Sequence, residues 1–283
     1  MLVVGAGQMG AGIAQVAAAA GMQVTLVDVG EEQLERGRAG IASSLEKLAS
    51  KGKCDDPGAV LARIATSTDL ASGADAELAI EAASEDVELK LALFRRLDQA
   101  LNAGALLASN TSSIPIGRLA AATGRPAQVC GMHFMNPPAL MPLVELIRGL
   151  ETSEETVAAV RAAAEAMGKT VAEARDVPGF LANRMLLPML NEAAFCLYEG
   201  VGDAEAIDTV MRLGMNHPLG PLALADLIGL DTCLAILEVL HDGFGDPKFR
   251  PCPLWRQYVE AGRLGRKAGR GFHEYAEGRA ASA

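Results

Sequence analysis

A histidine and a glutamate in the middle of the chain have the types and spacing of an acid/base pair. His133 lies near the end of the apolar run VCGMHF at 129–134, and Glu145 lies inside a second apolar run, LVELI at 143–147. The NPP segment at 136–138 separates the runs, and a turn there would fold the second strand back along the first. The carboxylate could then reach the imidazole, orient it and stabilise its protonated form. Such a pair suits removal of a hydroxyl proton; a structural histidine with a satisfied hydrogen bond is the alternative.

The second chemical feature is a glycine-rich loop near the start of the chain. The segment GAGQMG at 5–10 fits GxGxxG, follows the β-like run at 1–4 and precedes an Ala-rich helical stretch. Its glycines permit a tight turn and close approach of the backbone to a pyrophosphate, which the next helix N-terminus attracts. Asp28 follows the next β-like run, at 24–27, about 20 residues after the loop, where the fingerprint expects an acidic residue. The motif predicts a dinucleotide site that includes Gly5, Gly7, Gln8, Met9 and Gly10.

Asp28 also predicts which dinucleotide binds. A carboxylate at that strand end accepts hydrogen bonds from the ribose hydroxyls of NAD and repels the added phosphate of NADP. No arginine follows nearby, since the next residues are Val29, Gly30 and Glu31. Like charges about 4 Å apart repel by several kcal/mol at an effective dielectric of about 20. We therefore expect NAD; a solvated aspartate at a strand end is the alternative.

Alternating strand-like and helical runs predict an α/β sheet that positions these residues. The strands are expected at 1–4, 24–27, 78–82, 105–109, 129–134 and 143–147, and the helices at 8–20, 31–50, 87–101 and 152–167. The breaker DVPG at 176–179 ends this pattern. Helices are expected beyond it at 181–198, 204–213, 222–240 and 249–261. We predict a Rossmann-like NAD-binding domain over residues 1–178, followed by an all-helical substrate and dimerisation domain over residues 179–283.

Composition excludes several other classes of function. The 283 residues include 25 basic and 35 acidic side chains, and the resulting formal charge of −10 argues against nucleic acid as a partner. The apolar run at 11–27 is short for a membrane span, and no lysine or arginine precedes it, so neither an anchor nor a secretory signal is expected. Five scattered cysteines without a CxxC pair fit reduced thiols in the cytoplasm and predict no metal site.

Seven motifs, in order along nearly the whole chain, resemble those of the short-chain (S)-3-hydroxyacyl-CoA dehydrogenases, and most closely those of their bacterial 3-hydroxybutyryl-CoA branch. The motifs are GAGQMGAGIAQ at 5–15, IEAASED at 80–86, SNTSSI at 109–114, HFMNPPALMPLVE at 133–145, DVPGFLANR at 176–184, NHPLGPLALADLIGLD at 216–231 and GRKAGRGF at 265–272. The resemblance implies reversible, NAD-dependent oxidation of a 3-hydroxyacyl-CoA to the 3-oxoacyl-CoA. The rival hypotheses are a dehydrogenase of another 3-hydroxy acid or of 3-hydroxyadipyl-CoA, and a non-catalytic NAD-binding protein.

The same resemblance implies roles for individual residues. His133 would be the general acid/base and Glu145 its orienting partner. Asn183 would help to hold the substrate and the histidine, and Ser112 would contact the reacting oxygen near the nicotinamide. Further implied contacts are Glu85, Lys90 and Lys267 for the cofactor, and Asn136, Ser44 and Lys51 for the CoA part of the substrate.

Several of these roles have a structural alternative. Ser112 could cap a helix that begins near Ile116, and Asn183 could bond to the backbone of the hinge. The lysines over 47–53 could form a solvated helix end. The chain also departs from the family pattern: His273 stands where an aromatic residue is usual. The first strand is short, which leaves a start upstream of Met1 open.

The run at 222–240 predicts an oligomer. Its leucines, isoleucines and valine cover more than one stripe of a helix. A helix that is apolar nearly all round is buried on several sides. We therefore expect a homodimer formed through residues after about 180, as the resemblance also implies.

Overall fold

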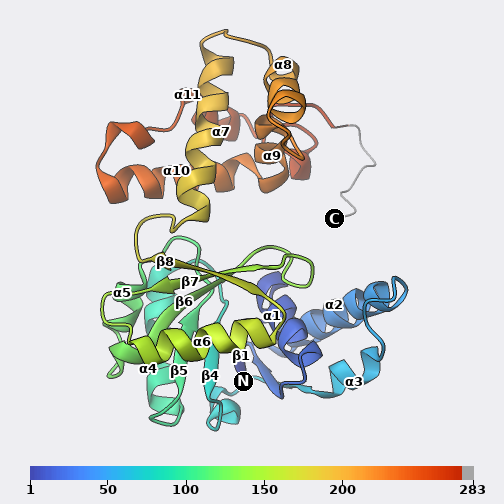
Figure 1. The fold of residues 1–283 in the computed structure, drawn as a ribbon, viewed down its shortest axis with the longest axis vertical. Helices are drawn as coiled ribbons and strands as arrows, with labels where there is room; N and C mark the ends of the chain where they lie inside the picture. Colours follow the sequence, from blue (N-terminus) through green and yellow to red (C-terminus); the bar gives the residue numbers. More distant parts are fainter. Residues whose placement is uncertain (276–283) are drawn as a thin grey trace. The chain divides into compact units, whose positions relative to one another are not determined.

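The computed structural model describes residues 1–275, in two compact units that divide between Val177 and Pro178 (Figure 1). Sequence analysis placed this border between residues 178 and 179. Each unit has its own apolar core. Among the described residues, no helix combines the length and the hydropathy that crossing a membrane requires.

The first unit is built on an eight-stranded sheet with the order β3-β2-β1-β4-β5-β6-β7-β8. The strands are β1 (Leu2–Val4), β2 (Val24–Val27), β3 (Ile64–Ser67), β4 (Leu78–Glu81), β5 (Leu106–Ser109), β6 (Val129–Phe134), β7 (Leu143–Arg148) and β8 (Thr170–Arg175). Neighbouring strands are parallel except β6 and β7, which run antiparallel. The predicted Rossmann-like architecture is confirmed.

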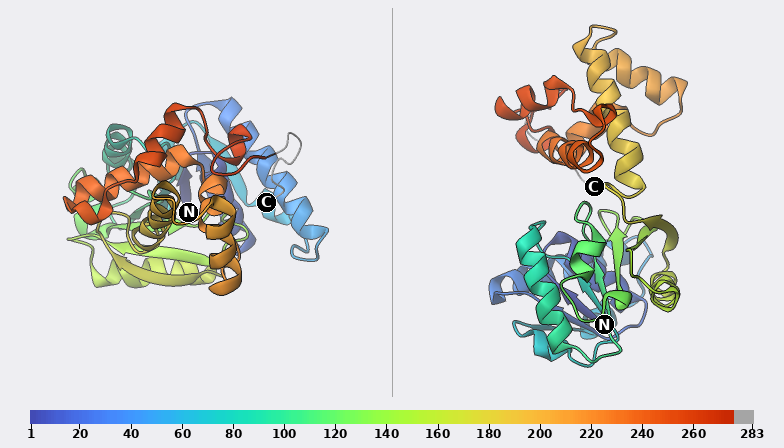
Figure 2. Two further views of the ribbon diagram at one scale, coloured as in Figure 1. Left: turned by 90° about the horizontal axis from the view of Figure 1, so that it is seen from above. Right: turned by 90° about the vertical axis from the view of Figure 1, so that its left-hand side faces the viewer.

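Helices cover both faces of this sheet. They are α1 (Gln8–Ala19), α2 (Glu31–Ala49), α3 (Pro57–Ala62), α4 (Val87–Ala100), α5 (Ile116–Ala120) and α6 (Glu154–Ala166). Apolar residues of α1, α2 and α6 share one buried cluster with the strands. Figure 2 shows α4 on the face opposite α6, and Phe94 and Leu97 of α4 are fully buried there. Alternate residues of each central strand therefore serve two cores, which explains the continuous apolar runs in the sequence.

The second unit is helical, as predicted, but two of the predicted helices differ from the structure. Its helices are α7 (Ala182–Tyr198), α8 (Ala204–Thr209), α9 (Pro221–Ile228), α10 (Leu230–Phe244) and α11 (Pro253–Glu260), with a π-helical turn over Val210–Gly214. The run at 222–240 is not one helix, because Gly229 has φ 105 and separates α9 from α10. A positive φ of this kind ends a helix and favours glycine. The helix predicted at 249–261 begins only at Pro253, after a 3₁₀ turn over Pro247–Phe249.

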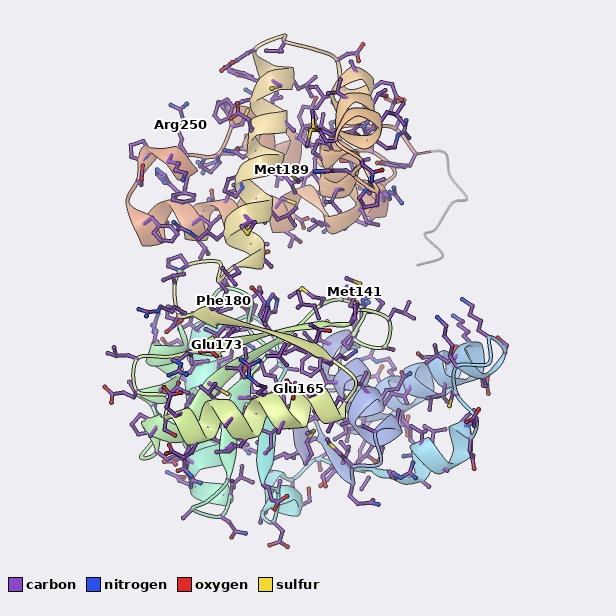
Figure 3. All side chains as sticks on the ribbon, viewed as in Figure 1. Met141, Glu165, Glu173, Phe180, Met189 and Arg250 are labelled. Carbon is purple, nitrogen blue, oxygen red and sulfur yellow. The ribbon has the colours of Figure 1, made fainter. Side chains whose placement is uncertain are left out.

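A buried asparagine joins three segments of this helical unit. Oδ1 of Asn191 accepts the backbone N–H of Cys252 at 2.8 Å and the indole N–H of Trp255 at 2.9 Å. Its Nδ2 donates to the carbonyl oxygen of Arg250 at 2.9 Å; Arg250 is labelled in Figure 3. Trp255 itself is wholly buried. This one side chain therefore satisfies two donors and one acceptor beneath α11.

Replacing Asn191 by leucine is expected to lower the free energy of unfolding of this unit by about 2 kcal/mol or more, because each buried polar group left unpaired costs about 1–3 kcal/mol. Trp255 is the only tryptophan in the chain, so its fluorescence during urea unfolding reports on this unit. Gln257→Leu, at an exposed position of α11, is the matched control and should change stability by less than about 0.5 kcal/mol. Equal losses of unfolding free energy in the two variants would contradict this role of Asn191.

Candidate active site

The carboxyl ends of the central parallel strands share one edge of the sheet. Val4 pairs with Val27 on one side and with Glu81 on the other, and Glu81 pairs with Ser109. His133 lies one residue before the end of β6. Ligands of doubly wound sheets bind outside this edge, so the predicted cofactor and acid/base residues belong to one region of the first unit.

The loop between β1 and α1 is shaped to receive a phosphate group. Gly5 has φ 104, and a Cβ there would lie 2.6 Å from the carbonyl oxygen of Ala82. A Cβ on Gly10 would lie 1.8 Å from the carbonyl oxygen of Gly5, so neither position has space for a side chain. Gly7 is the N-cap of α1 and offers no side chain to the first amides of that helix. The helix thus keeps its N-terminal N–H groups and dipole for an anion, which fits the pyrophosphate of a dinucleotide.

Asp28 lies directly beside this loop. Its Oδ2 accepts the N–H of Ala6 at 2.6 Å, and its Oδ1 accepts the N–H of Val29 at 2.7 Å. A cavity of about 390 Å³ adjoins it and is lined by Gly7 of the glycine loop and by residues of β1, β2 and α4, including Arg96. Arg96 was not predicted from the sequence, because no arginine directly follows Asp28 and this one comes from a helix far along the chain.

The antiparallel pairing of β6 with β7 places His133 directly opposite Glu145. Nδ1 of the imidazole lies 2.8 Å from Oε2 of the carboxylate, which is buried. The prediction that the second strand folds back along the first is therefore confirmed. An ionised Glu145 accepts a hydrogen from Nδ1, and this bond fixes the neutral ring in the tautomer whose lone pair is on Nε2. The arrangement can take up a proton at Nε2 and stabilise the resulting imidazolium.

Glu85 organises the turn that carries Ser112. Its Oε1 accepts the hydroxyl of Thr111, the hydroxyl of Ser113 at 2.9 Å and the N–H of Ser112 at 3.1 Å. Burial by itself raises the pKa of Glu85. The bond from Thr111, the charge of Lys90 and the bonds from Ser113 and Ser112 outweigh that effect, so the pKa of Glu85 lies below its ordinary value.

Ser112 is not the cap of the helix near Ile116. The first amides of α5, those of Ile116 and Gly117, donate to the carboxylate of Asp176 at 2.9 and 2.7 Å. The capping alternative for Ser112 is therefore wrong, because a residue distant in sequence fills that position. Sequence analysis missed Asp176, since capping residues are sought directly before a helix.

The loop after β6 is held from two sides. Oδ1 of Asn136 accepts the side-chain amide of Gln8 at 3.1 Å, so two predicted binding residues meet next to the glycine loop. Lys169 donates to the carbonyl oxygens of Pro138 at 2.6 Å and Met141 at 2.9 Å; Met141 is labelled in Figure 3. Burial lowers the pKa of Lys169. Lys169 was not predicted from the sequence, because nothing in the order of residues connects it with this loop.

The remaining predicted residues lie in varied settings. Lys90 is buried in α4, and its ammonium donates to Glu81 at 2.6 Å and to the carbonyl oxygen of Ala83 at 3.2 Å. Ser44 is half-buried on α2, and Lys51 is exposed beyond the end of that helix. In the second unit, Asn183 lies in the first turn of α7, and Lys267 donates to both carboxylate oxygens of Asp231 at 2.7 Å.

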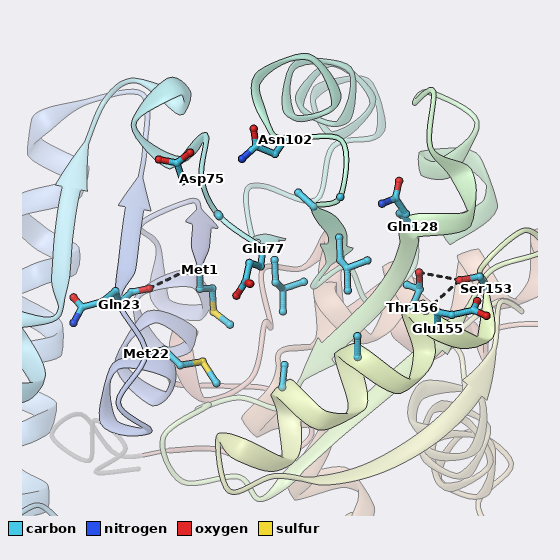
Figure 4. Close-up of a pocket in the computed structure, with 17 residues that line it drawn as sticks. Met1, Met22, Gln23, Asp75, Glu77, Asn102, Gln128, Ser153, Glu155 and Thr156 are labelled. Atoms are coloured by element: carbon cyan, nitrogen blue, oxygen red, sulfur yellow. Dashed lines mark hydrogen bonds between the residues drawn. The ribbon is translucent and has the colours of Figure 1, made fainter.

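A further hollow in the first unit, of about 990 Å³, lies away from this site. Figure 4 shows it beside Met1, Met22, Gln23, Glu77 and Gln128, which lie at the amino ends of strands β1, β2, β4 and β6. Because the glycine loop, Asp28 and His133 all lie toward the carboxyl ends, this hollow does not belong to the candidate active site.

The fold and the carboxyl-edge site together define a dinucleotide-binding protein of the Rossmann type. Residues 1–177 match the family described as "3-hydroxyacyl-CoA dehydrogenase, NAD binding domain", and residues 179–275 match "3-hydroxyacyl-CoA dehydrogenase, C-terminal domain". The chain belongs to the 3-hydroxyacyl-CoA dehydrogenase family. The predicted family, enzyme class and cofactor, NAD, are thereby confirmed.

The similarity to known proteins extends over almost the whole chain. The chain is 58% identical over 274 residues to a probable 3-hydroxybutyryl-CoA dehydrogenase of Deinococcus radiodurans, covering 96% of this chain and 99% of the relative. It is 53% identical over 275 residues to a 3-hydroxybutyryl-CoA dehydrogenase of Bradyrhizobium diazoefficiens, covering 96% and 94%. The crystal structure of (S)-3-hydroxybutyryl-CoA dehydrogenase from Ralstonia eutropha is 48% identical, with a TM-score of 0.96 and 98% of each chain covered.

Proposed function

We propose that the chain oxidises a short (S)-3-hydroxyacyl-CoA, with 3-hydroxybutyryl-CoA as the preferred substrate, to the 3-oxoacyl-CoA, and that the reaction is reversible. The observation that carries the proposal is the 2.8 Å contact between His133 and Glu145, at the cofactor edge of an NAD-binding sheet. The names of the relatives support the four-carbon acyl group, since three of them are called 3-hydroxybutyryl-CoA dehydrogenases.

In the proposed reaction, the glycine loop and Asp28 hold the dinucleotide, and Glu85, Lys90 and Lys267 are the further cofactor contacts. When bound, the nicotinamide accepts the hydride from C3 of the substrate in the oxidative direction. Nε2 of His133 removes the proton of the 3-hydroxyl, and Glu145 stabilises the imidazolium. In the reductive direction, the imidazolium returns the proton to the same oxygen.

Two further side chains are proposed to act on the reacting end of the substrate. Ser112 donates a hydrogen bond to the oxygen on which charge develops, as groups that stabilise an oxyanion do. Asn183 helps to hold the substrate and the histidine. Toward the other end, Asn136, Ser44 and Lys51 are the proposed contacts for CoA; the exposed ammonium of Lys51 suits a phosphate.

The test is oxidation of NADH with acetoacetyl-CoA, compared with free acetoacetate and with 3-oxoadipyl-CoA, and repeated with NADPH. The proposal predicts turnover with NADH and acetoacetyl-CoA and a much lower rate in each other combination. Preference for free acetoacetate or for the six-carbon thioester would reject the proposed substrate and favour the corresponding rival. Binding of NADH without turnover of any of these substrates would favour a non-catalytic protein.

We also propose a homodimer through the helical unit. The dimer was predicted from the run at 222–240, taken as one helix that is apolar nearly all round. That reason is wrong, because α9 and α10 are separate helices and many of their leucines fill the core of the unit. Exposed apolar side chains support the proposal instead: Met185 is 73% exposed, Val201 74%, Leu213 74% and Met215 62%. A contiguous apolar patch on a surface is typical of a protein interface, and the proposal is that these side chains belong to one.

Light scattering during size-exclusion chromatography is expected to give the mass of two chains at micromolar concentration. Leu213→Glu should shift the protein toward the mass of one chain, because a charge buried at an interface is costly. Leu150→Glu is the matched control, at an apolar residue of the first unit that is 89% exposed, and it should leave the mass unchanged. A wild-type protein with the mass of one chain would refute the dimer.

The proposed compartment is the cytoplasm. All five cysteines lie in the described part of the chain, and all five are free thiols. Burial raises the pKa of both Cys130 and Cys233 to about 12, which disfavours the reactive thiolate. Unpaired thiols of this kind suit a reducing compartment.

A further inference from the structure

A buried ion pair lies where β4 and β5 end. Glu81, the last residue of β4, is 0% exposed, and Lys90 of α4 is 1% exposed. Nζ of Lys90 lies 2.6 Å from Oε1 of Glu81, whereas Oε2 accepts the hydroxyl of Ser109, the last residue of β5, at 2.6 Å. Removing two charges from water is costly, so such a pair is weak evidence for a role in stability alone. The contacts around the ion pair are therefore the guide to its role.

Both oxygens of this carboxylate lead to the turn that follows β5. On one side, Oγ of Ser109 accepts the N–H of Thr111 at 3.2 Å. On the other side, the ammonium of Lys90 lies 3.4 Å from Oε2 of Glu85, whose second oxygen accepts the N–H of Ser112 at 3.1 Å. Two separate routes thus connect the buried Glu81 with the backbone around Ser112.

The same turn is bonded to the strand that carries His133. Oδ1 of Asn110 accepts the N–H of Phe134, the residue after His133, at 2.8 Å. The N–H of Asn110 donates in turn to the backbone carbonyl oxygen of Glu81 at 2.8 Å. A continuous set of hydrogen bonds therefore extends from Glu81 both to the turn of Ser112 and to the end of β6.

We propose that Glu81 is a positioning residue that sets Ser112 relative to His133 by holding Lys90 and Ser109. The inference rests on the proposed function, in which both Ser112 and His133 act on the same substrate oxygen. Glu81 does not touch the substrate itself. A misplacement of about 1 Å in such an arrangement can lower a rate by about 100-fold, so loss of this support should lower kcat more than it raises KM.

Three variants test the proposal. Ser109→Ala removes one route and leaves the ion pair in place; kcat should fall by about 10-fold, with the Kd of NADH changed by less than about twofold. Glu81→Gln should lower kcat by about 100-fold. Because Glu81→Gln leaves a buried ammonium without its carboxylate, E81Q/K90M is made as well, so that no buried charge remains at this position.

Amide hydrogen exchange provides a readout that does not depend on activity. The amides of Thr111, Ser112 and Ile114 should exchange faster in all three variants, since these amides lie in the supported turn. E81Q/K90M also removes the proposed cofactor contact of Lys90, so its kcat is measured with saturating NADH. A positioning role then predicts wild-type unfolding behaviour together with fast exchange in the turn and low kcat. If kcat recovers along with stability, or if exchange in the turn and kcat both match the wild type, the inference is overturned.

Asp98→Asn is the matched control. It also changes a carboxylate to an amide in this unit, on α4, where Asp98 bonds to Nε of Arg125 at 2.7 Å and to the N–H of Gly124 at 2.7 Å. It should lower stability without changing kcat or exchange in the turn. A fall in kcat equal to that of Glu81→Gln would mean general loosening and would reject the proposal. A wild-type protein that is inactive with every thioester would refute the proposed function. The rate of amide hydrogen exchange in the turn would still show whether Glu81 supports the position of Ser112.

Discussion

Replacing His133 by alanine is expected to lower kcat with acetoacetyl-CoA by at least about 100-fold, because positioned acid/base catalysis contributes about 10²–10⁴-fold. The glycine loop and Asp28 do not depend on the imidazole, so the affinity for NADH should change little. Steady-state rates and fluorescence titration with NADH measure the two quantities separately. The combination of lost turnover and retained cofactor binding is the expected signature of a lost acid/base.

Two further variants make this result specific. Glu145→Gln retains the size of the side chain but removes the charge that stabilises the imidazolium, so kcat should also fall. His241→Ala changes a partly exposed histidine of α10 and should leave kcat unchanged. Retention of more than about one tenth of the wild-type kcat in His133→Ala would fall outside the range expected of a general acid/base and would contradict its role.

Replacing Asp28 by asparagine is expected to reduce the preference for NADH over NADPH by at least about 100-fold, since repulsion between like charges about 4 Å apart is worth several kcal/mol. The amide oxygen can still accept the N–H of Ala6, as the carboxylate does at 2.6 Å, so the loop should keep its shape. Arg96 lines the same cavity, and its positive charge favours the added phosphate once the carboxylate is gone. The ratio of kcat/KM for the two cofactors measures the preference.

The control for Asp28 is the nearby Glu31→Gln. Glu31 is an exposed carboxylate at the start of α2, and its loss changes the net charge by the same amount. This variant should retain the preference for NADH. If Asp28→Asn also retains it, the choice of cofactor depends on something other than charge repulsion at the end of β2.

The strands of the central sheet could be predicted because they are buried on both faces. β1, β2 and β4–β7 are marked by short apolar runs in the sequence, and such runs are typical of strands enclosed by two layers of helices. The edge strands β3 and β8 were missed. Their residues are mostly exposed or half-buried, so their sequences, IATS and TVAEAR, have few apolar positions.

The division of the run at 222–240 was missed for a different reason. Leu222 to Leu240 has a continuous helical pattern, and one internal glycine is compatible with a helix at a cost of about 1 kcal/mol. Gly229 has a positive φ, which L side chains rarely adopt, and a Cβ there would lie 3.0 Å from Oδ1 of Asp231 and 3.2 Å from Nζ of Lys267, which comes from a distant segment. Periodicity carries no information about such a contact.

Some contacts of the candidate site could likewise be predicted from the sequence, and others could not. The His133–Glu145 pair could be predicted because the two residues lie on consecutive strands and alternate side chains of a strand share a face. Arg96, Lys169 and the Glu81–Ser109 bond could not, since their contacts join segments that are far apart in sequence. A buried carboxylate at the end of a strand is visible in the sequence, but its partners are not.

The most direct test of the central claim follows the transferred hydrogen. The wild-type protein would be mixed with acetoacetyl-CoA and NADH deuterated at both C4 positions, and the product thioester analysed by mass spectrometry. We predict 3-hydroxybutyryl-CoA with one deuterium on C3, formed by the wild type and almost absent with His133→Ala. Consumption of the labelled NADH without deuterium on C3 of the thioester would contradict the account.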